Sequence, residues 1–186
     1  MTRTEDIDDP VARAFITEAR RLLSRDYLPK IEHCLERLDA DGVWWRPNPA
    51  SNSVGNLLLH LAGNARQWIV AGVGGAEDVR ARQDEFDAGT RGDEASLPTA
   101  QELTARLRAT LEEVDQVLAR LEPRSLLDSR RIQGLSDVSV LAAVFHVVEH
   151  FSMHTGQIIQ LTKLREGRDL NFYDFSGGAP RANWDR

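Results

Sequence analysis

Four of the five histidines are candidate ligands for one metal ion, of which three would bind it. His146, His150 and His154 recur every four residues, a spacing that places side chains on one face of a helix. Two imidazoles one turn apart can reach one ion at about 2.0–2.1 Å, and His60 from a second helix would complete a three-histidine site. The row rises about 12 Å along its helix, so the pair is either His146/His150 or His150/His154. Spacing alone leaves both open.

Polar neighbours favour the second pair. Gln157 follows His154 by three positions and Asn64 follows His60 by four, so each could form a hydrogen bond beside the metal site. Burying imidazoles without partners is costly, and the alternative to a metal site is a hydrogen-bonded ladder of core histidines. His33 has no histidine at helical spacing and is expected to be exposed or half-exposed.

The histidine row does not match a zinc protease. That chemistry needs a glutamate inside the pair, in the order His-Glu-x-x-His. Phe151, Ser152 and Met153 fill the interval between the last two histidines instead. Glu149 precedes the pair and points about 100° away around the helix.

Other side chains could contribute to chemistry only if the fold brings them to the histidines. Glu149 and Tyr173 are candidate acid–base groups on that condition. Cys34 is the single cysteine, and we expect a small buried residue rather than a nucleophile. Three tryptophans could line a pocket near the ion or belong to the core: Trp44, Trp45 and Trp68.

Helical periodicity dominates the sequence, and strand patterns are nearly absent. The pattern predicts four long helices, over about residues 10–38, 53–71, 99–121 and 137–165. Pro29 should kink or divide the first helix, and Gly167 should end the fourth. The segments between the helices are predicted to be loops, with one helical turn within 76–97 and a short extended piece near 130–133.

These elements predict an all-α fold and a four-helix bundle. The connections between its helices are rich in loops, and an aromatic tail follows from Arg168 to the C-terminus. A length of 186 residues suits one domain, over residues 1–186.

Composition excludes several classes of protein. Lys and Arg number 23 and Asp and Glu 29, so the net charge is −6, which argues against a nucleic-acid or anionic-membrane surface. No apolar run approaches the ~20 residues of a membrane span, and the acidic N-terminus lacks the apolar stretch of a signal peptide. One cysteine excludes an internal disulfide. We therefore expect a cytoplasmic protein.

Two stretches of the sequence resemble the DinB/YfiT-like superfamily. The first is Asn56-Leu-Leu-Leu-His60-Leu-Ala-Gly-Asn64, followed by Arg-Gln-Trp. The second is Glu149-His-Phe-Ser-Met-His-Thr-Gly-Gln157-Ile, which is similar to the last-helix pattern of that superfamily. The tail, with Phe172-Tyr-Asp, resembles a narrower subfamily of the group.

The resemblance implies an up-down-down-up bundle with a divalent metal ion held by His60, His150 and His154. His146 then becomes a neighbour of the site rather than a ligand. Members commonly form dimers, so a homodimer is expected. The chain departs from the usual pattern at Met153 and Thr155, which leaves the ligands intact but changes the expected surroundings of a thiol.

The resemblance also suggests an activity. Members include transferases and isomerases that use low-molecular-weight thiols, so we expect a metal-dependent S-transferase acting on a small molecule. The alternatives are a metal-dependent hydrolase and a non-catalytic bundle stabilised by its ion. Histidine ligands suit zinc, nickel, copper or iron, and zinc or nickel is expected.

Overall fold

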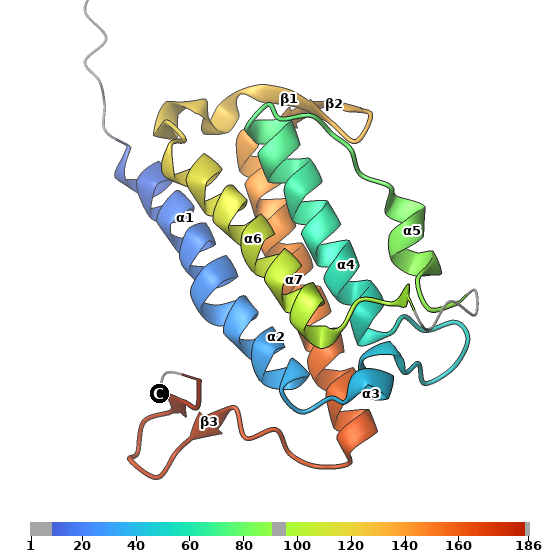
Figure 1. Cartoon of the computed structure of the whole chain (residues 1–186). Coiled ribbons are helices and arrows are strands. Elements are labelled where there is room, and N and C mark those ends of the chain that lie inside the picture. Colours follow the sequence, from blue (N-terminus) through green and yellow to red (C-terminus); the bar gives the residue numbers. More distant parts are fainter. Residues whose placement is uncertain (1–8, 91–95, 185–186) are drawn as a thin grey trace, which may run out of the picture.

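The computed structural model describes residues 9–90 and 96–184. These residues are mostly helical, with two small antiparallel sheets (Figure 1). Long helical segments lie side by side, and short elements and loops connect them at the ends. The prediction of a helical protein is confirmed, whereas the prediction of an all-α chain missed the two sheets.

The first long segment combines α1 (Pro10–Arg21), a π-helical turn η1 (Leu22–Tyr27) and α2 (Leu28–Leu35). Asp9 caps its start by accepting hydrogen bonds from two backbone N–H groups. The segment accommodates Pro29 by means of the wider turn, in which the N–H of Leu28 bonds to the carbonyl of Leu23. The irregularity predicted from Pro29 therefore takes the form of a π-turn just before it.

The second long segment combines α4 (Val54–Ala65) with a π-helical stretch η2 (Arg66–Val73). Ser53 and Asn56 form a capping box at its start. A short helix α3 (Ala40–Trp44) precedes it, where the sequence pattern predicted only loop. The short helix α5 (Arg82–Asp87) follows it, within the segment predicted to hold one helical turn.

The third long segment is α6 (Ala100–Ala119), which begins with a capping box of Thr99 and Glu102. A 3₁₀ turn η4 (Pro123–Leu127) leads into a hairpin of β1 (Ser129–Ile132) and β2 (Leu135–Ser139). Gln133 and Gly134 connect the strands with positive φ angles of 54° and 78°, as a tight two-residue hairpin turn requires. The extended piece predicted near 130–133 is therefore one strand of a pair.

The fourth long segment is α7 (Val140–Glu166). It starts three residues later than predicted, because residues 137–139 belong to β2 and Ser139 caps the helix. Gly167 ends it with a φ of 65°. Membrane-spanning character is absent from the described helices, since none is both long and apolar enough.

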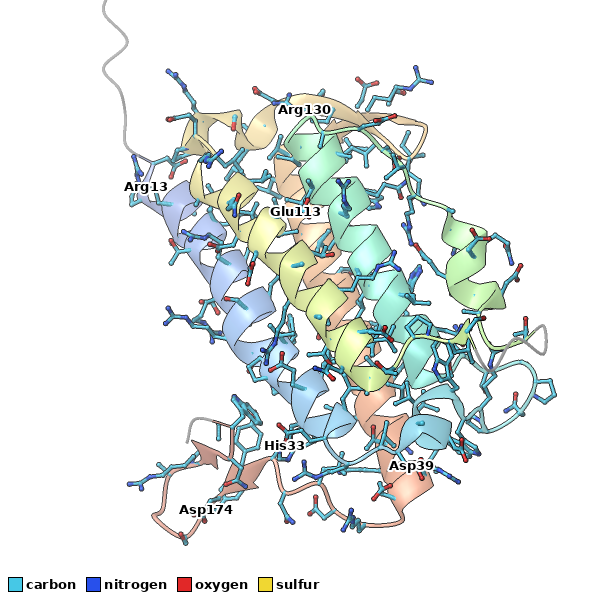
Figure 2. The ribbon with its side chains drawn as sticks, in the orientation of Figure 1. Arg13, His33, Asp39, Glu113, Arg130 and Asp174 are labelled. Atoms are coloured by element: carbon cyan, nitrogen blue, oxygen red, sulfur yellow. The ribbon has the colours of Figure 1, made fainter. Side chains whose placement is uncertain are left out.

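The aromatic tail folds back onto α2 and forms a second hairpin, β3 (Tyr173–Asp174) with β4 (Arg181–Ala182). The tail covers His33 of α2 (Figure 2). Nε2 of His33 lies 2.7 Å from the carbonyl oxygen of Leu170, and its ring lies 5.1 Å from that of Phe172. The prediction of an exposed or half-exposed His33 was wrong, because the tail buries it.

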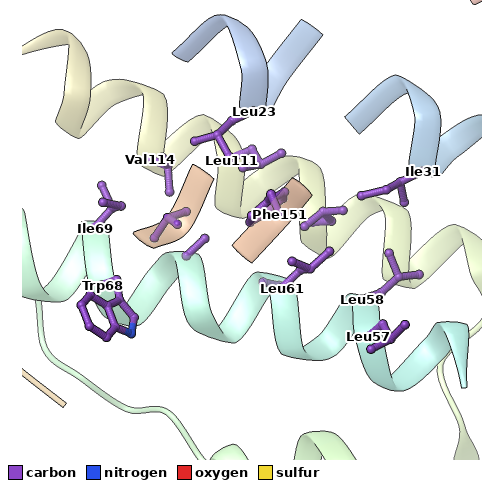
Figure 3. Packing of buried hydrophobic residues seen from close by; sticks show 14 of the residues in the cluster. Leu23, Ile31, Leu57, Leu58, Leu61, Trp68, Ile69, Leu111, Val114 and Phe151 are labelled. Atoms are coloured by element: carbon purple, nitrogen blue, oxygen red, sulfur yellow. The ribbon is translucent and has the colours of Figure 1, made fainter. Parts of the chain in front are cut away.

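The hydrophobic core fills the space between the long segments (Figure 3). Phe151 of α7 is fully buried at the centre, among residues such as Leu61 of α4 and Leu111 of α6. This packing holds α4 against α7, and these are the two helices that carry the candidate metal ligands.

Candidate metal centre

Three histidines from two helices converge in one group. His60 comes from α4, and His150 and His154 come from successive turns of α7. One ring nitrogen from each can be chosen so that all three lie within 4.8 Å of one another. The structure thus brings together the His150/His154 pair with His60, and it leaves His146 outside this group.

The three imidazoles face one another closely. Nε2 of His150 lies 2.9 Å from Nε2 of His60. The ring of His154 stands nearly perpendicular to both others, with centroids 5.2 Å from that of His60 and 4.3 Å from that of His150. His60 and His154 are buried, and His150 is half-buried. The group is therefore compact and largely withdrawn from water.

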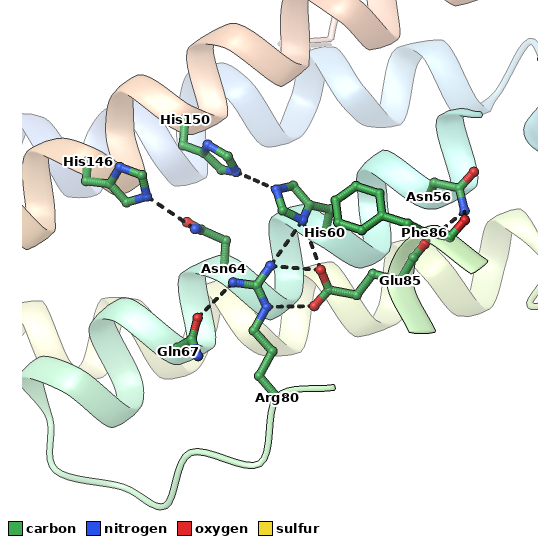
Figure 4. A network of polar contacts seen from close by, with 9 residues as sticks. All are labelled: Asn56, His60, Asn64, Gln67, Arg80, Glu85, Phe86, His146 and His150. Carbon is green, nitrogen blue, oxygen red and sulfur yellow. Dashed lines mark hydrogen bonds and ion pairs between the residues drawn. The ribbon is translucent and has the colours of Figure 1, made fainter. Parts of the chain in front are cut away.

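A buried ion pair of Arg80 and Glu85 contacts Nδ1 of His60, on the side of the ring away from His150 (Figure 4). Nδ1 of His60 lies 2.9 Å from Oε2 of Glu85. Arg80 donates from Nε to Oε1 of Glu85 at 2.7 Å and from Nη2 to Oε2 at 2.8 Å. The side chains of Arg80 and Glu85 are only 5% and 7% exposed, so the pair is desolvated and mutually compensated.

This arrangement determines which nitrogen of His60 carries the proton. Burial by itself would raise the pKa of Glu85, but the hydrogen bonds from Arg80 and His60 lower it, so the carboxylate is ionised and can only accept. Nδ1 of His60 is therefore the N–H donor, although Nη2 of Arg80 also lies 3.1 Å from it. Nε2 is left with its lone pair directed toward the other histidines.

In His154, too, Nδ1 is the ring nitrogen that carries the proton. Its Nδ1 lies 2.6 Å from Oε1 of Gln157, an oxygen that can only accept. Its Nε2 is therefore the unprotonated atom. Burial lowers the pKa of His154, and it lowers that of His150 to about 3, with the neighbouring histidines adding to the effect. Burial thus favours the neutral form of His150 and His154, which is the form that binds metal ions.

His146 occupies a separate place on the border of the group. The amide of Asn64 lies 3.3 Å from its Nε2. Its ring lies against Trp68, with centroids 4.1 Å apart, and stacks on His150 at 5.3 Å. Asn64 therefore contacts His146 rather than the ligand His60, for which the sequence suggested it.

Arg80 and Glu85 are the site residues that the sequence analysis missed. They lie in a polar stretch that carries no motif, and nothing in their spacing points to His60. The backbone around Glu85 is fixed by the buried amide of Asn56, whose Nδ2 donates to the carbonyl oxygens of Glu85 and Ala88 at 2.9 Å each. The sequence does show that Asn56 can form a capping box with Ser53. It does not show that the same side chain also binds the backbone around Glu85, because that is a tertiary contact.

The remaining candidates lie elsewhere or at the margin. Glu149 is exposed and 4.0 Å from Nδ1 of His146, and Tyr173 lies in the tail against α2. Trp44 is half-buried and donates to the carbonyl of Pro98 at 3.1 Å, and Trp45 is also half-buried. Cys34 is buried, and burial raises the pKa of its thiol to about 11, which makes it a poor nucleophile.

A cavity lies beside the Arg80–Glu85 ion pair. It has a volume of about 290 Å³ and is bordered by Gly63, Gln67, Arg80 and Glu85, but by none of the three histidines. Because no candidate ligand borders it, this cavity does not give access to the histidine group.

The donor set fits one divalent ion. Two of the three rings have Nδ1 engaged by an acceptor, which leaves Nε2 for a ligand bond. Three neutral nitrogens do not cancel the charge of the ion, and such sites keep a position open for water or substrate. The three histidines could therefore bind a metal ion and leave it accessible to chemistry.

Residues 20–169 match the model of the mycothiol S-transferase family, a DinB/YfiT-like family. The chain belongs to this family. Among solved structures it is similar to a conserved protein from Enterococcus faecalis, with a TM-score of 0.60 and 18% identity over 85% of this chain and 96% of that one. That likeness concerns the fold alone. The search of curated proteins found no match.

Proposed function

We propose that this protein is a metal-dependent S-transferase that joins a low-molecular-weight thiol to a small electrophilic molecule. His60, His150 and His154 would hold one divalent ion, zinc or nickel. The observation that carries the proposal is the convergence of these three histidines in a chain of the mycothiol S-transferase family. The family description makes mycothiol, or a thiol like it, the first candidate substrate.

Each side chain has a defined part in this proposal. The ion would lower the pKa of a thiol bound at its open position, so that the reactive thiolate is present at neutral pH. Gln157 would keep Nδ1 of His154 protonated and its Nε2 free. His146, half-buried beside His150, would border the space in which the thiol and the electrophile meet.

The same proposal extends to architecture and assembly. We propose an up-down-down-up bundle over a single domain, supported by the long connection between η2 and α6, which allows both segments to run in the same direction (Figure 1). We also propose a homodimer. It is supported by large apolar side chains on the outer face of α7, where Leu141, Phe145 and Met153 are 38%, 56% and 52% exposed. A cytoplasmic location stays a prediction.

The test combines metal content with turnover. The purified protein should contain or take up one zinc or nickel ion per chain, and the double variant His150→Ala/His154→Ala should not. With the ion present, mycothiol or N-acetylcysteine plus monochlorobimane should give the thioether conjugate faster than the uncatalysed reaction. With the ion removed by a chelator, the rate should return to background.

Three other outcomes would lead to different conclusions. Metal-dependent cleavage of an activated ester without added thiol would indicate a hydrolase. A protein that binds one ion but conjugates none of the cellular thiols would be a metal-stabilised bundle without this chemistry. Absence of any bound ion would leave the three histidines as a core ladder.

A further inference from the structure

We propose that Glu85 is the positioning residue for the metal ligand His60, and that metal binding and docking of residues 76–88 stabilise each other. We call residues 76–88 the Arg80 segment. The inference rests on the proposed metal site, but its experiments separate the two. It concerns a carboxylate and an arginine that lie outside the helices bearing the three histidines.

The first step is the hydrogen bonding of Glu85. Both of its carboxylate oxygens are occupied from one side by Arg80, at 2.7 and 2.8 Å, and Oε2 also accepts from Nδ1 of His60 at 2.9 Å. The carboxylate therefore has a fixed orientation. A fixed acceptor at Nδ1 fixes both the tautomer and the ring plane of the imidazole, so Nε2 is directed to one point.

The second step is the space that Glu85 needs. Gly63 lies one turn after His60 on α4, and a Cβ atom built on it would overlap with Oε1 of Glu85. The carboxylate cannot move aside easily, because Arg80 and His60 hold it. Any side chain at position 63 therefore competes with the carboxylate for its place beside His60.

The third step is the attachment of the Arg80 segment. Its backbone is bound to Asn56 at the start of α4, through the carbonyls of Glu85 and Ala88. The ring of Phe86 lies 4.8 Å from the ring of His60. The segment therefore contacts α4 at two residues that are one helical turn apart. The first is Asn56, and the second is the candidate ligand His60.

Reciprocity follows from these contacts. If the docked segment raises the affinity of the site for metal, bound metal must favour the docked segment by the same factor. The Arg80 segment holds few residues of the hydrophobic core, so its docking depends strongly on the polar contacts with α4. Metal occupancy should therefore be detectable in this segment, away from the ion itself.

A matched pair of double variants tests the role of the acceptor. Arg80→Met/Glu85→Leu removes both charges together, so that no buried charge is left unpaired, and it removes the acceptor for Nδ1. Arg80→Met/Glu85→Gln has the same net charge but restores an acceptor oxygen. Zinc affinity, measured by competition with a chromophoric chelator, should fall 10–100-fold in the Leu variant and recover at least in part in the Gln variant.

A second pair tests the space beside Glu85. Gly63→Ala should lower zinc affinity, whereas Gly156→Ala should not, because a Cβ at position 156 meets nothing within 4 Å. Both glycines lie inside helices that bear ligands, so the change in helix propensity is matched. Melting of the metal-free proteins verifies that each variant is folded.

Hydrogen exchange tests the coupling. Adding zinc should slow amide exchange over Arg82–Asp87 in the parent protein and have less effect there in Arg80→Met/Glu85→Leu. A parent that binds no zinc overturns the proposed function itself. A parent that binds zinc, with equal affinities in the Leu and Gln variants or with unchanged exchange over Arg82–Asp87, overturns this inference alone.

Discussion

Nε2 of His60 and Nε2 of His150 lie 2.9 Å apart, although 90 positions separate the two residues in the chain. Packing of α4 against α7 brings these nitrogens together, and an ion bound between the helices would connect them. Metal binding should therefore stabilise the folded state, because the unfolded chain holds no such group.

Zinc should raise the melting temperature of the parent protein. At a free concentration 100 times the dissociation constant, the gain in unfolding free energy is about 2.7 kcal/mol. Thermal denaturation with and without the ion measures the gain. His60→Ala should abolish most of it, and an undiminished shift in that variant would place the ion elsewhere.

His146 provides a test of ligand assignment within the α7 row. It contacts Asn64 and Trp68 and lies outside the converging group. His146→Ala should therefore retain one ion per chain, whereas His154→Ala should lose the ion or bind it at least ~100-fold more weakly. Elemental analysis after dialysis compares the two variants. Loss of the ion in His146→Ala alone would favour the other pair that the spacing allows.

Acid should destabilise the metal-free protein. Burial lowers the pKa of His150 to about 3 from its ordinary value of 6.5. Below about pH 6.5 the unfolded chain binds a proton at this residue, whereas the folded chain does not. The contribution of His150 to the unfolding free energy is therefore fully present above pH 6.5 and is lost as the pH drops toward 3. This group changes the unfolding free energy by at most about 1.4 kcal/mol per pH unit.

Melting curves between pH 7.5 and 4.5 measure that slope, with a chelator present throughout. His150→Gln should flatten it, because the neutral amide does not titrate. An equal slope in the variant would show that other groups account for the acid sensitivity.

The tail should detach when its contact with α2 is removed. Nε2 of His33 bonds to the carbonyl of Leu170, and its ring lies against Phe172. His33→Ala deletes a buried hydrogen bond and leaves a cavity, so the unfolding free energy should fall by about 2 kcal/mol. Limited proteolysis should then cut within residues 168–184. Zinc affinity should not change, because His33 contacts the tail and is not one of the three converging histidines.

The proposed dimer can be tested on α7. Phe145 is 56% exposed on its outer face, and Phe145→Arg would place a charge in any interface that covers it. Sedimentation velocity should show a dimer for the parent protein and a monomer for the variant. A parent protein that sediments as a monomer would contradict the dimer directly.

The long helices could be predicted because each carries its own local signals. Asp9, Ser53 and Thr99 are residue types that favour helix N-caps, and they cap the helices that begin close to the predicted starts. Gly167 ends the fourth helix as predicted. The hairpin 129–139 was largely missed, because its turn is Gln-Gly rather than the usual Asn-Gly and its strands are mostly polar.

The candidate site was predictable only in part. Helical spacing predicted two possible ligand pairs, His146/His150 and His150/His154. The resemblance to the DinB/YfiT-like superfamily selected the second pair. Glu85 could not be found in this way, because its contact with His60 spans 25 positions and depends on how the Arg80 segment folds over α4. The same applies to His33, whose burial comes from a tail about 137 residues further along.

The π-turn η1 has a consequence for how related chains should be aligned. A π-turn is equivalent to one residue inserted into an α-helix, and deleting a residue there would restore regular α-helical geometry. Relatives that lack one residue within Leu22–Tyr27 can therefore continue through this stretch as a regular α-helix and keep the residues equivalent to Ile16 and Ile31 on the core side. η2 begins after His60, so a length change there leaves the register of His60 unaltered. These two stretches are where single-residue gaps can enter the long helices while the histidine group stays intact.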